Sequence, residues 1–224
     1  IHQPGHEQAR NYYRDLNLEN ATATVRYEVN GVNYTRTVFS SFSDNVIMVR
    51  LEADKSKALS FSLSYDSPLK SAVTVKGRKL LVRCEGAEHE GIPAAMHAEC
   101  RVEVKTDGVQ NTADKQLVIT DATTATIYIS AATNFVNYRD VSADAAKRAE
   151  NYLKAAVRKP YETSLAAHVS LYKKQFDRVS FSLPATEQSL AETDTRVLNF
   201  HKGNDLNLAA LLFQYGRYLL IDRK

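Results

Sequence analysis

Apolar and polar residues alternate along the first 140 positions, which is the pattern of β-strands with one buried face. Residues 21–29 read ATATVRYEV, and Asn30-Gly31 follows, a dipeptide suited to the positive φ angles of a type I′ hairpin turn. Residues 32–39 are the expected partner strand. Further short alternating runs follow at 47–53, 59–65, 73–75, 80–84, 98–104, 116–120 and 126–131. The spacing predicts an antiparallel β-sandwich in which each strand turns one face to the second sheet.

After residue 141 the apolar period becomes helical. Ser142 is the expected N-cap of a first helix, with Asp144 in its first turn and Pro160 beyond its end. Its buried stripe is expected at Ala145, Ala149, Tyr152, Leu153 and Ala156. A second stripe predicts another helix, with Leu165, Val169, Tyr172 and Phe176 on one side. Residues 179–183 (VSFSL) predict a short strand, and residues 184–196 a polar loop.

The last helix is predicted at residues 205–221, DLNLAALLFQYGRYLLI, and carries large apolar side chains on nearly every face. Such a helix is buried on all sides in a complete protein. We therefore expect the chain to be an interior part of a larger protein, and we expect this helix to self-associate when its partners are absent. Gly216 is expected to admit a neighbouring helix. Arg217 is expected to pair with a carboxylate of the linker or sandwich rather than to point at a substrate cavity.

These patterns divide the chain into three predicted parts. Residues 1–140 are a β-sandwich domain, and residues 141–196 are a helical linker. Residues 197–224 are the truncated start of a helical domain.

Composition narrows the possible partners. The 224 residues carry 29 basic and 26 acidic side chains, interspersed, for a net charge of +3. A nucleic-acid partner is therefore not expected, because it requires clustered Lys and Arg. No run has the apolar length of a membrane span, and no signal-peptide region is present.

Titratable residues give several candidate sites, each with a structural alternative. Glu85, Glu88 and Glu90 surround His89 and could hold a cation, although a solvated hairpin loop is favoured. Glu192 and Asp194 precede Arg196, and capping or ion pairing near the last helix is favoured there. Structural roles are also favoured for three histidines, His97, His168 and His201.

The sequence gives only weak indications of thiol chemistry, phosphate binding, nucleophilic catalysis or sugar stacking. Cys84 and Cys100 follow the parity of buried positions, so two free thiols are favoured over a cross-strand disulfide. The chain has 8 Gly and no phosphate-cradling loop, and no Ser is flanked as in a nucleophile elbow. Tyr is plentiful but Trp is absent, so a sugar-stacking platform is not favoured. We predict no catalytic, cofactor-binding or metal-binding residue within the chain.

Four segments together resemble glycoside hydrolase family 95: residues 12–51, SAATNF at 130–135, residues 166–183, and TDTRV…LAALLFQYGRYLLI at 193–221. The resemblance implies an N-terminal β-supersandwich, whose first strands are expected to be missing from residues 1–140, a helical linker and the first helix of an (α/α)6 barrel. It implies a secreted or periplasmic bacterial exo-α-L-fucosidase that inverts configuration at α-1,2-linked fucose. The implied general acid Glu, and the Asp and asparagines that hold the water, all follow the GRYLLI segment, so no catalytic residue is carried over.

The implied partner is a fucosylated oligosaccharide, bound by the barrel outside this chain. Two alternatives stay open. One is another inverting hydrolase or phosphorylase with the same sandwich–linker–barrel order. The other is a non-catalytic carbohydrate-binding or structural module.

Overall fold

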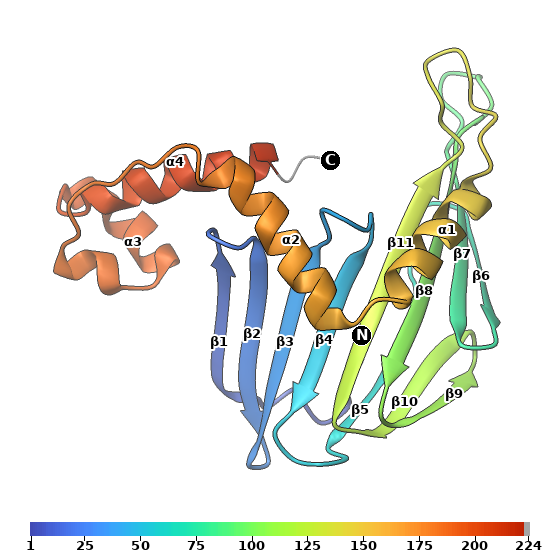
Figure 1. The fold of residues 1–224 in the computed structure, drawn as a ribbon, viewed down its shortest axis with the longest axis horizontal. Coiled ribbons are helices and arrows are strands. Elements are labelled where there is room, and N and C mark those ends of the chain that lie inside the picture. The colour runs from blue at the N-terminus through green and yellow to red at the C-terminus, as the bar shows by residue number, and fades with distance from the viewer. Residues whose placement is uncertain (222–224) are drawn as a thin grey trace.

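The computed structural model describes residues 1–221, in which two antiparallel sheets precede a helical segment (Figure 1). In chain order the strands are β1 (Arg10–Asn17), β2 (Thr22–Val29), β3 (Val32–Ser40), β4 (Ile47–Ala53), β5 (Leu59–Leu63), β6 (Ser71–Lys76), β7 (Lys79–Glu85), β8 (His97–Thr106), β9 (Val109–Ala113), β10 (Gln116–Ala122) and β11 (Thr124–Thr133). The predicted sandwich is confirmed.

A large sheet faces a small one. The eight-stranded sheet has the order β1-β2-β3-β4-β11-β8-β7-β6, and the three-stranded sheet has the order β5-β10-β9. The main core lies between them and includes Leu51, Phe61, Val82, Ile119 and Ile127. Asn30 and Gly31 have φ angles of 51° and 71°, so the hairpin predicted there is also confirmed.

Two strands lie outside the predicted series, and both are edge strands. β1 closes one edge of the large sheet, and all of its residues but one are exposed. β9 closes one edge of the small sheet and is similarly exposed. An edge strand with neither face buried has no need for alternating apolar residues, so the sequence carries no period of two there.

Helix α1 (Ala145–Val157) packs on the outer face of the large sheet, across β11 and β8 (Figure 1). Its expected stripe is confirmed at Ala145, Ala149, Leu153 and Ala156, which are all buried. The expected cap at Ser142 is wrong. Asp144 caps the helix instead, because its Oδ1 accepts a hydrogen bond of 2.9 Å from the Lys147 amide.

The helices bury the central strands on both faces. Met48 on β4 and Tyr128 on β11 are 0% and 1% exposed, and both pack against Leu153 of α1 in a second core. The expectation of one polar face therefore fails in the middle of the large sheet. At these positions the alternation is between two cores rather than between core and solvent.

Helix α2 (Tyr161–Phe176) crosses the outer face over β3 and β4 and reaches the turn between β1 and β2 (Figure 1). Tyr172 and Phe176 are buried as expected, but Leu165 and Val169 are only half-buried. Ser164 and His168 complete the buried face instead. The first half of the buried face of α2 is therefore offset by one residue from the expected face.

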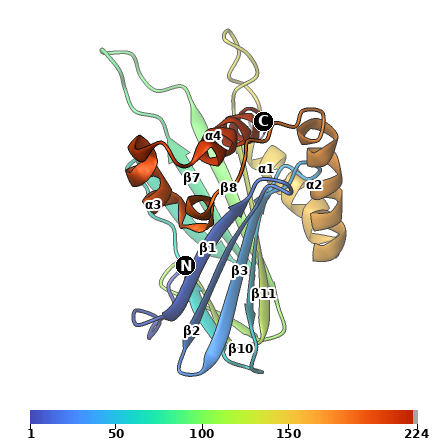
Figure 2. The same ribbon diagram turned by 90° about the vertical axis from the view of Figure 1, so that its left-hand side faces the viewer.

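Past α2 the chain forms a small helical unit beyond the ends of β1 and β2 (Figure 2). Its elements are the 3-10 turn η1 (Glu187–Leu190), α3 (Thr193–Asn199), the 3-10 turn η2 (Phe200–Lys202) and α4 (Leu206–Ile221). Residues 184–196 are therefore not all loop. Thr186 and Ser189 exchange hydrogen bonds that cap η1. The sequence did not predict this turn, because it has no periodic pattern of apolar residues. No helix within residues 1–221 is long and apolar enough to cross a membrane.

Candidate functional site

The acidic group around His89 lies in the loop between β7 and β8, and Glu88, His89 and Glu90 are all exposed. Glu85 forms an ion pair of 2.7 Å with Lys70. Its hydrogen bond from Lys70 holds the pKa of the Glu85 carboxyl below the usual value. Nowhere in residues 1–221 do three His, Cys, Asp or Glu side chains gather as a metal site would require.

The second acidic group separates into different roles. Glu192 is the N-cap residue of α3, and Asp194 lies in its first turn. Arg196 is buried and donates to Asp205 through two bonds, Nε to Oδ2 at 2.7 Å and Nη2 to Oδ1 at 3.0 Å. The hydrogen bond from Arg196 holds the pKa of Asp205 below its usual value. Because Asp205 Oδ1 also accepts from the Leu208 amide, this pair joins α3 to the start of α4.

The predicted structural role of His168 is confirmed, and the residue binds the linker to the sandwich. Its Nε2 lies 3.1 Å from the Asn20 carbonyl oxygen and 3.2 Å from that of Ala21. Since both partners are acceptors, Nε2 carries the hydrogen. One turn on, the Tyr172 hydroxyl donates to the Leu18 carbonyl oxygen at 2.7 Å.

The remaining flagged side chains have local contacts. His201 Nδ1 lies 3.0 Å from the Leu198 carbonyl oxygen, and the His97 backbone amide donates to Asn134. Cys84 is buried and Cys100 half-buried, and both are free thiols. Burial raises the pKa of the Cys100 thiol.

A salt bridge that the sequence did not single out fastens the turn between α1 and α2. Lys159 binds the carboxylate of Asp44, whose side chain is 1% exposed, in the loop between β3 and β4. Burial alone would raise the pKa of Asp44, but hydrogen bonds from Lys159, Ser43 and Ser41 outweigh it and lower the pKa. No periodicity marks such a pair, because its members lie 115 residues apart.

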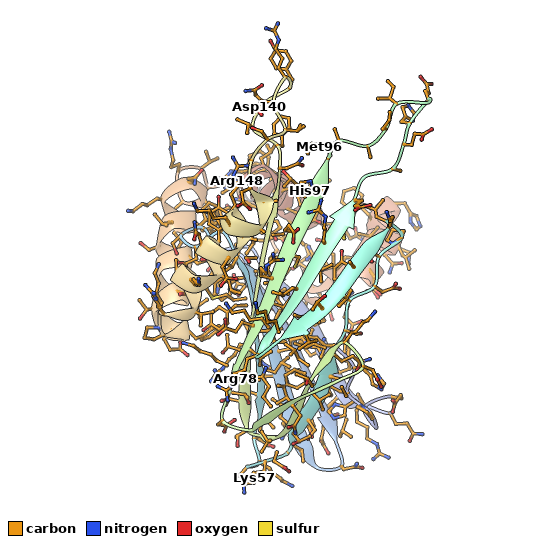
Figure 3. All side chains as sticks on the ribbon, turned by 90° about the vertical axis from the view of Figure 1, so that its right-hand side faces the viewer. Lys57, Arg78, Met96, His97, Asp140 and Arg148 are labelled. Carbon is orange, nitrogen blue, oxygen red and sulfur yellow. The ribbon has the colours of Figure 1, made fainter. Side chains whose placement is uncertain are left out.

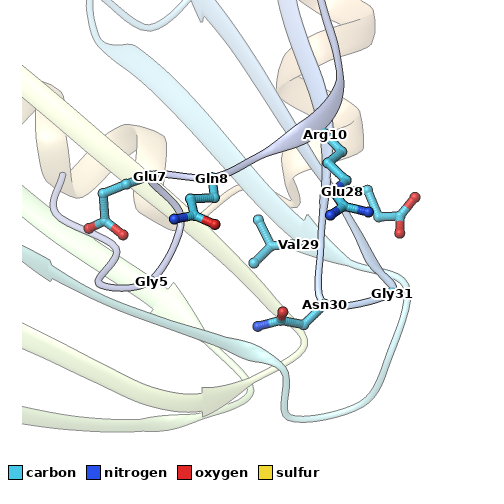
Figure 4. A pocket seen from close by; sticks show the side chains of 8 residues that line it. All are labelled: Gly5, Glu7, Gln8, Arg10, Glu28, Val29, Asn30 and Gly31. Atoms are coloured by element: carbon cyan, nitrogen blue, oxygen red, sulfur yellow. The ribbon is translucent and has the colours of Figure 1, made fainter.

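Two of the clefts that residues 1–221 form have volumes of a few hundred Å³. The larger, about 440 Å³, lies between the N-terminal segment and the β2–β3 hairpin and contains Glu7, Gln8, Arg10 and Glu28 (Figure 4). Glu7 and Glu28 point away from each other there, so they do not flank a common bond as the carboxyl pair of a glycosidase must (Figure 4). The second cleft, about 330 Å³, lies between Phe42, Ile47 and Tyr152 and contains no charged side chain.

One side of α4 exposes several large apolar side chains. Only Leu208 and Ala210 of this helix are buried. Leu211, Tyr218 and Ile221 are half-buried. Six other large apolar side chains are exposed: Leu206 56%, Leu212 68%, Phe213 44%, Tyr215 41%, Leu219 50% and Leu220 71%. Single exposed apolar residues are ordinary, but a continuous apolar face marks a contact surface. We call these six residues the α4 apolar face.

Three polar side chains of α4 hold an extended segment. The carbonyl oxygens of Val179, Phe181 and Leu183 accept from the side chains of Arg217, Gln214 and Asn207, at 2.8, 3.4 and 3.3 Å. Residues 179–183 are therefore not a strand, although their alternation is real. Every second carbonyl faces helix side chains instead of a neighbouring strand.

Arg217 differs from its expected role. It finds backbone carbonyls rather than a carboxylate: Nη2 donates to the Phe176 oxygen at 2.6 Å, and its guanidinium lies 4.6 Å from the Phe176 ring centroid. It thereby satisfies carbonyls at the C-terminal end of α2. The expected neighbouring helix at Gly216 stays a prediction. A Cβ added there would meet nothing within 4 Å in the described part of the chain.

Two protein-family models match successive parts of the chain. Residues 1–138 match the model of the glycosyl hydrolase family 65 N-terminal domain. Residues 160–222 match the model of the glycosyl hydrolase family 95 catalytic domain.

Individual relatives agree with these matches. Alpha-L-fucosidase 2 of Arabidopsis thaliana is 33% identical over 94% of the chain and 29% of its own length. A protein of Aspergillus niger assigned as alpha-fucosidase A is 27% identical over 94% of the chain and 28% of its length. The chain thus spans less than a third of these relatives. A solved structure from the human microbiome, assigned as a kojibiose phosphorylase, superposes with a TM-score of 0.53 at 14% identity. It covers 94% of this chain and 27% of its own, and supports the fold alone.

Proposed function

We propose that the chain is a non-catalytic part of an α-L-fucosidase. It belongs to the glycosyl hydrolases, because its N-terminal part matches the family 65 N-terminal domain and its resemblance to family 95 is confirmed. The observation that carries this proposal is the identity of 33% to a plant α-L-fucosidase along almost the whole chain. In this proposal the sandwich and linker brace a helical catalytic domain, and the α4 apolar face lies in the core of that domain.

The finer proposal is an exo-acting enzyme that releases terminal α-1,2-linked fucose with inversion. An inverting site needs two carboxyl groups about 6.5–9.5 Å apart, with room for a water between them. The clefts described above offer no such pair, which supports locating the catalytic groups outside this chain. The proposed enzyme is bacterial and periplasmic or extracellular, as the family resemblance implies.

The test is to assay a longer polypeptide that contains this chain and the rest of the catalytic domain, beside the 224-residue chain alone. On an α-1,2-fucosyl galactoside the longer polypeptide should release fucose, and proton NMR should show inverted anomeric configuration at the first turnover. The 224-residue chain should release none. Retained configuration would overturn the inverting mechanism, and absence of release from any fucoside or L-galactoside would overturn the fucosidase proposal. Cleavage that depends on inorganic phosphate would favour a phosphorylase instead.

A further inference from the structure

Two loops project past the sandwich at the end of the large sheet where α4 also lies. The first, residues 86–96, joins β7 to β8, and the second, residues 134–144, joins β11 to α1 (Figures 1 and 3). They meet at their bases and diverge toward their tips (Figure 2). We call them the loop pair.

Hydrogen bonds hold the two loops together at their base. Asn134 is 3% exposed, and its Nδ2 donates to the Ala95 and Val141 oxygens at 2.9 and 2.8 Å while its Oδ1 accepts from the His97 amide. Arg148 of α1 donates to the Phe135 oxygen at 2.7 Å. One buried side chain therefore holds both loops, so their position relative to the sheet is fixed where they leave it.

The outer parts carry apolar side chains into solvent. Ile92 is 70% exposed on the first loop. On the second, Phe135, Val136 and Tyr138 are 47%, 45% and 82% exposed. The second tip is a closed turn, because Val136 donates to the Asp140 oxygen at 2.9 Å and Asp140 to the Asn137 oxygen at 3.0 Å. Exposed apolar groups on a built turn indicate a contact surface rather than a solvated connection.

The position of the loop pair points to its occupant. In Figures 1 and 2 the loop pair and α4 lie beyond the same end of the large sheet, α4 above β1–β3 and the loops beyond β8 and β11. A domain that covers the α4 apolar face therefore also approaches the loops. The relatives are more than three times as long as this chain, and residues 160–222 match a catalytic domain, so such a domain has the required size.

We propose that the loop pair is a second docking surface for the catalytic domain that includes α4. The inference rests on the proposed function only for the existence of that domain, not for its activity. The sandwich then contacts the domain twice: through α2 and α4 at one side of the sheet, and through Ile92, Phe135 and Tyr138 at the other. Two separated contacts fix the orientation of the domain, which a single helical linker does not.

Hydroxyl-radical footprinting tests the contact directly. Ile92, Phe135 and Tyr138 should label several-fold more slowly in the longer polypeptide than in the dilute 224-residue chain. Tyr12, which is 61% exposed on β1, serves as the internal reference. Equal labelling of the loop residues in the two polypeptides would overturn the proposal. So would protection in the 224-residue chain that grows with its concentration, because a second copy would then be the occupant.

A matched pair of substitutions gives an independent readout. Val136→Asp should lower the melting temperature of the longer polypeptide by several degrees and leave that of the 224-residue chain unchanged. Val109→Asp, at a valine of similar exposure on β9, should affect both polypeptides alike. If Val136→Asp also affects both alike, the proposal is wrong. Fucosidase activity is scored separately: an inactive polypeptide with protected loops refutes the proposed function alone, and an active one with unprotected loops refutes the docking surface alone.

Discussion

Beyond the apolar packing of α1, individual polar side chains fasten α2 and the turn before it to the sandwich. His168 and Tyr172 reach backbone carbonyls of residues 18–21, and Lys159 reaches the buried carboxylate of Asp44. Each contact joins segments more than 110 residues apart. The angle at which the helices leave the sheet therefore depends on a few polar bonds that single substitutions can remove.

Replacement of Tyr172 by Phe isolates one of these bonds. The change leaves the Leu18 carbonyl without the hydroxyl donor while the ring still packs on Phe176. We expect a loss of about 1 kcal/mol in the free energy of unfolding, the typical net contribution of one buried hydrogen bond. Urea denaturation measures it. Tyr12→Phe, at an exposed tyrosine, should be neutral, and equal losses in the two variants would contradict this role.

Asp44 should make stability depend on acid. Its pKa is lowered in the folded state from an ordinary value of 3.8, so the folded state favours the ionised form. The stabilisation is complete above the ordinary value and is lost as pH falls through the lower folded value. The difference in urea midpoint between the parent chain and Asp44→Asn should therefore be constant from pH 7 to about pH 5 and shrink below pH 3.8. A difference that is still unchanged at pH 2.5 would contradict it.

At the scale of the element, the sequence predicted most structure where one face meets a core. Nine strands, α1, α2 and α4 follow from apolar period, and the Asn30-Gly31 turn follows from backbone preference. Edge strands β1 and β9, the turn η1 and helix α3 lack that signal because their residues are largely exposed. The extended segment 179–183 kept its period of two but lacked a strand partner, which only the position of α4 reveals.

The attachment of α1 to the sheet should behave as part of the core. Leu153 is fully buried among Phe39, Met48 and Tyr128, so Leu153→Ala should destabilise by about 2–5 kcal/mol through lost burial and an unfilled cavity. The neighbouring change Lys154→Ala, at an exposed position, should cost less than about 1 kcal/mol. Denaturant titration compares them. If the two changes cost the same, α1 is not packed as described.

The α4 apolar face should cause the 224-residue chain to associate. Each large side chain left in water forgoes about 1.5–3 kcal/mol of burial, and two such faces can cover each other in a two-fold contact. Light scattering should show dimers or larger species at micromolar concentration. The double change Leu212→Ser and Leu220→Ser should restore a monomer, as should truncation near Arg196, whereas Leu190→Ser on η1 should not. A monomeric parent chain with α4 fully protected from hydrogen exchange would refute the prediction.

On the scale of the whole molecule, the proposed function makes the chain a support with contact surfaces rather than a reaction centre. The candidate carboxylates and histidines resolve into caps, ion pairs and exposed loop positions. Their chemistry could be anticipated from sequence, but their partners could not, because Arg196 and Asp205 or His168 and Ala21 become neighbours only in the fold. The division at residues 140 and 196, and the lack of catalytic groups, stay predictions.

If the sandwich only braces, it should not bind the substrate. Titration of the 224-residue chain with fucosylated oligosaccharides, followed by calorimetry, should give no saturable heat up to millimolar concentration. The larger cleft contains charged side chains and no exposed aromatic platform, which supports this expectation. Saturable binding that is lost in a Glu28→Gln variant would instead assign that cleft as a glycan site. Binding unaffected by this variant would also contradict the bracing role, and would locate the glycan elsewhere.

The bonds from α2 to residues 18–21 have an evolutionary consequence. Their acceptors are main-chain carbonyls, which every residue type supplies, whereas their donors are the particular side chains His168 and Tyr172. The loop should therefore tolerate substitution more readily than the helix. The loop can exchange its side chains while it keeps its backbone path, and the helix cannot exchange its two rings without loosening the joint. Among related sequences, we therefore expect His168 and Tyr172 to be retained while the side chains of residues 18–21 vary.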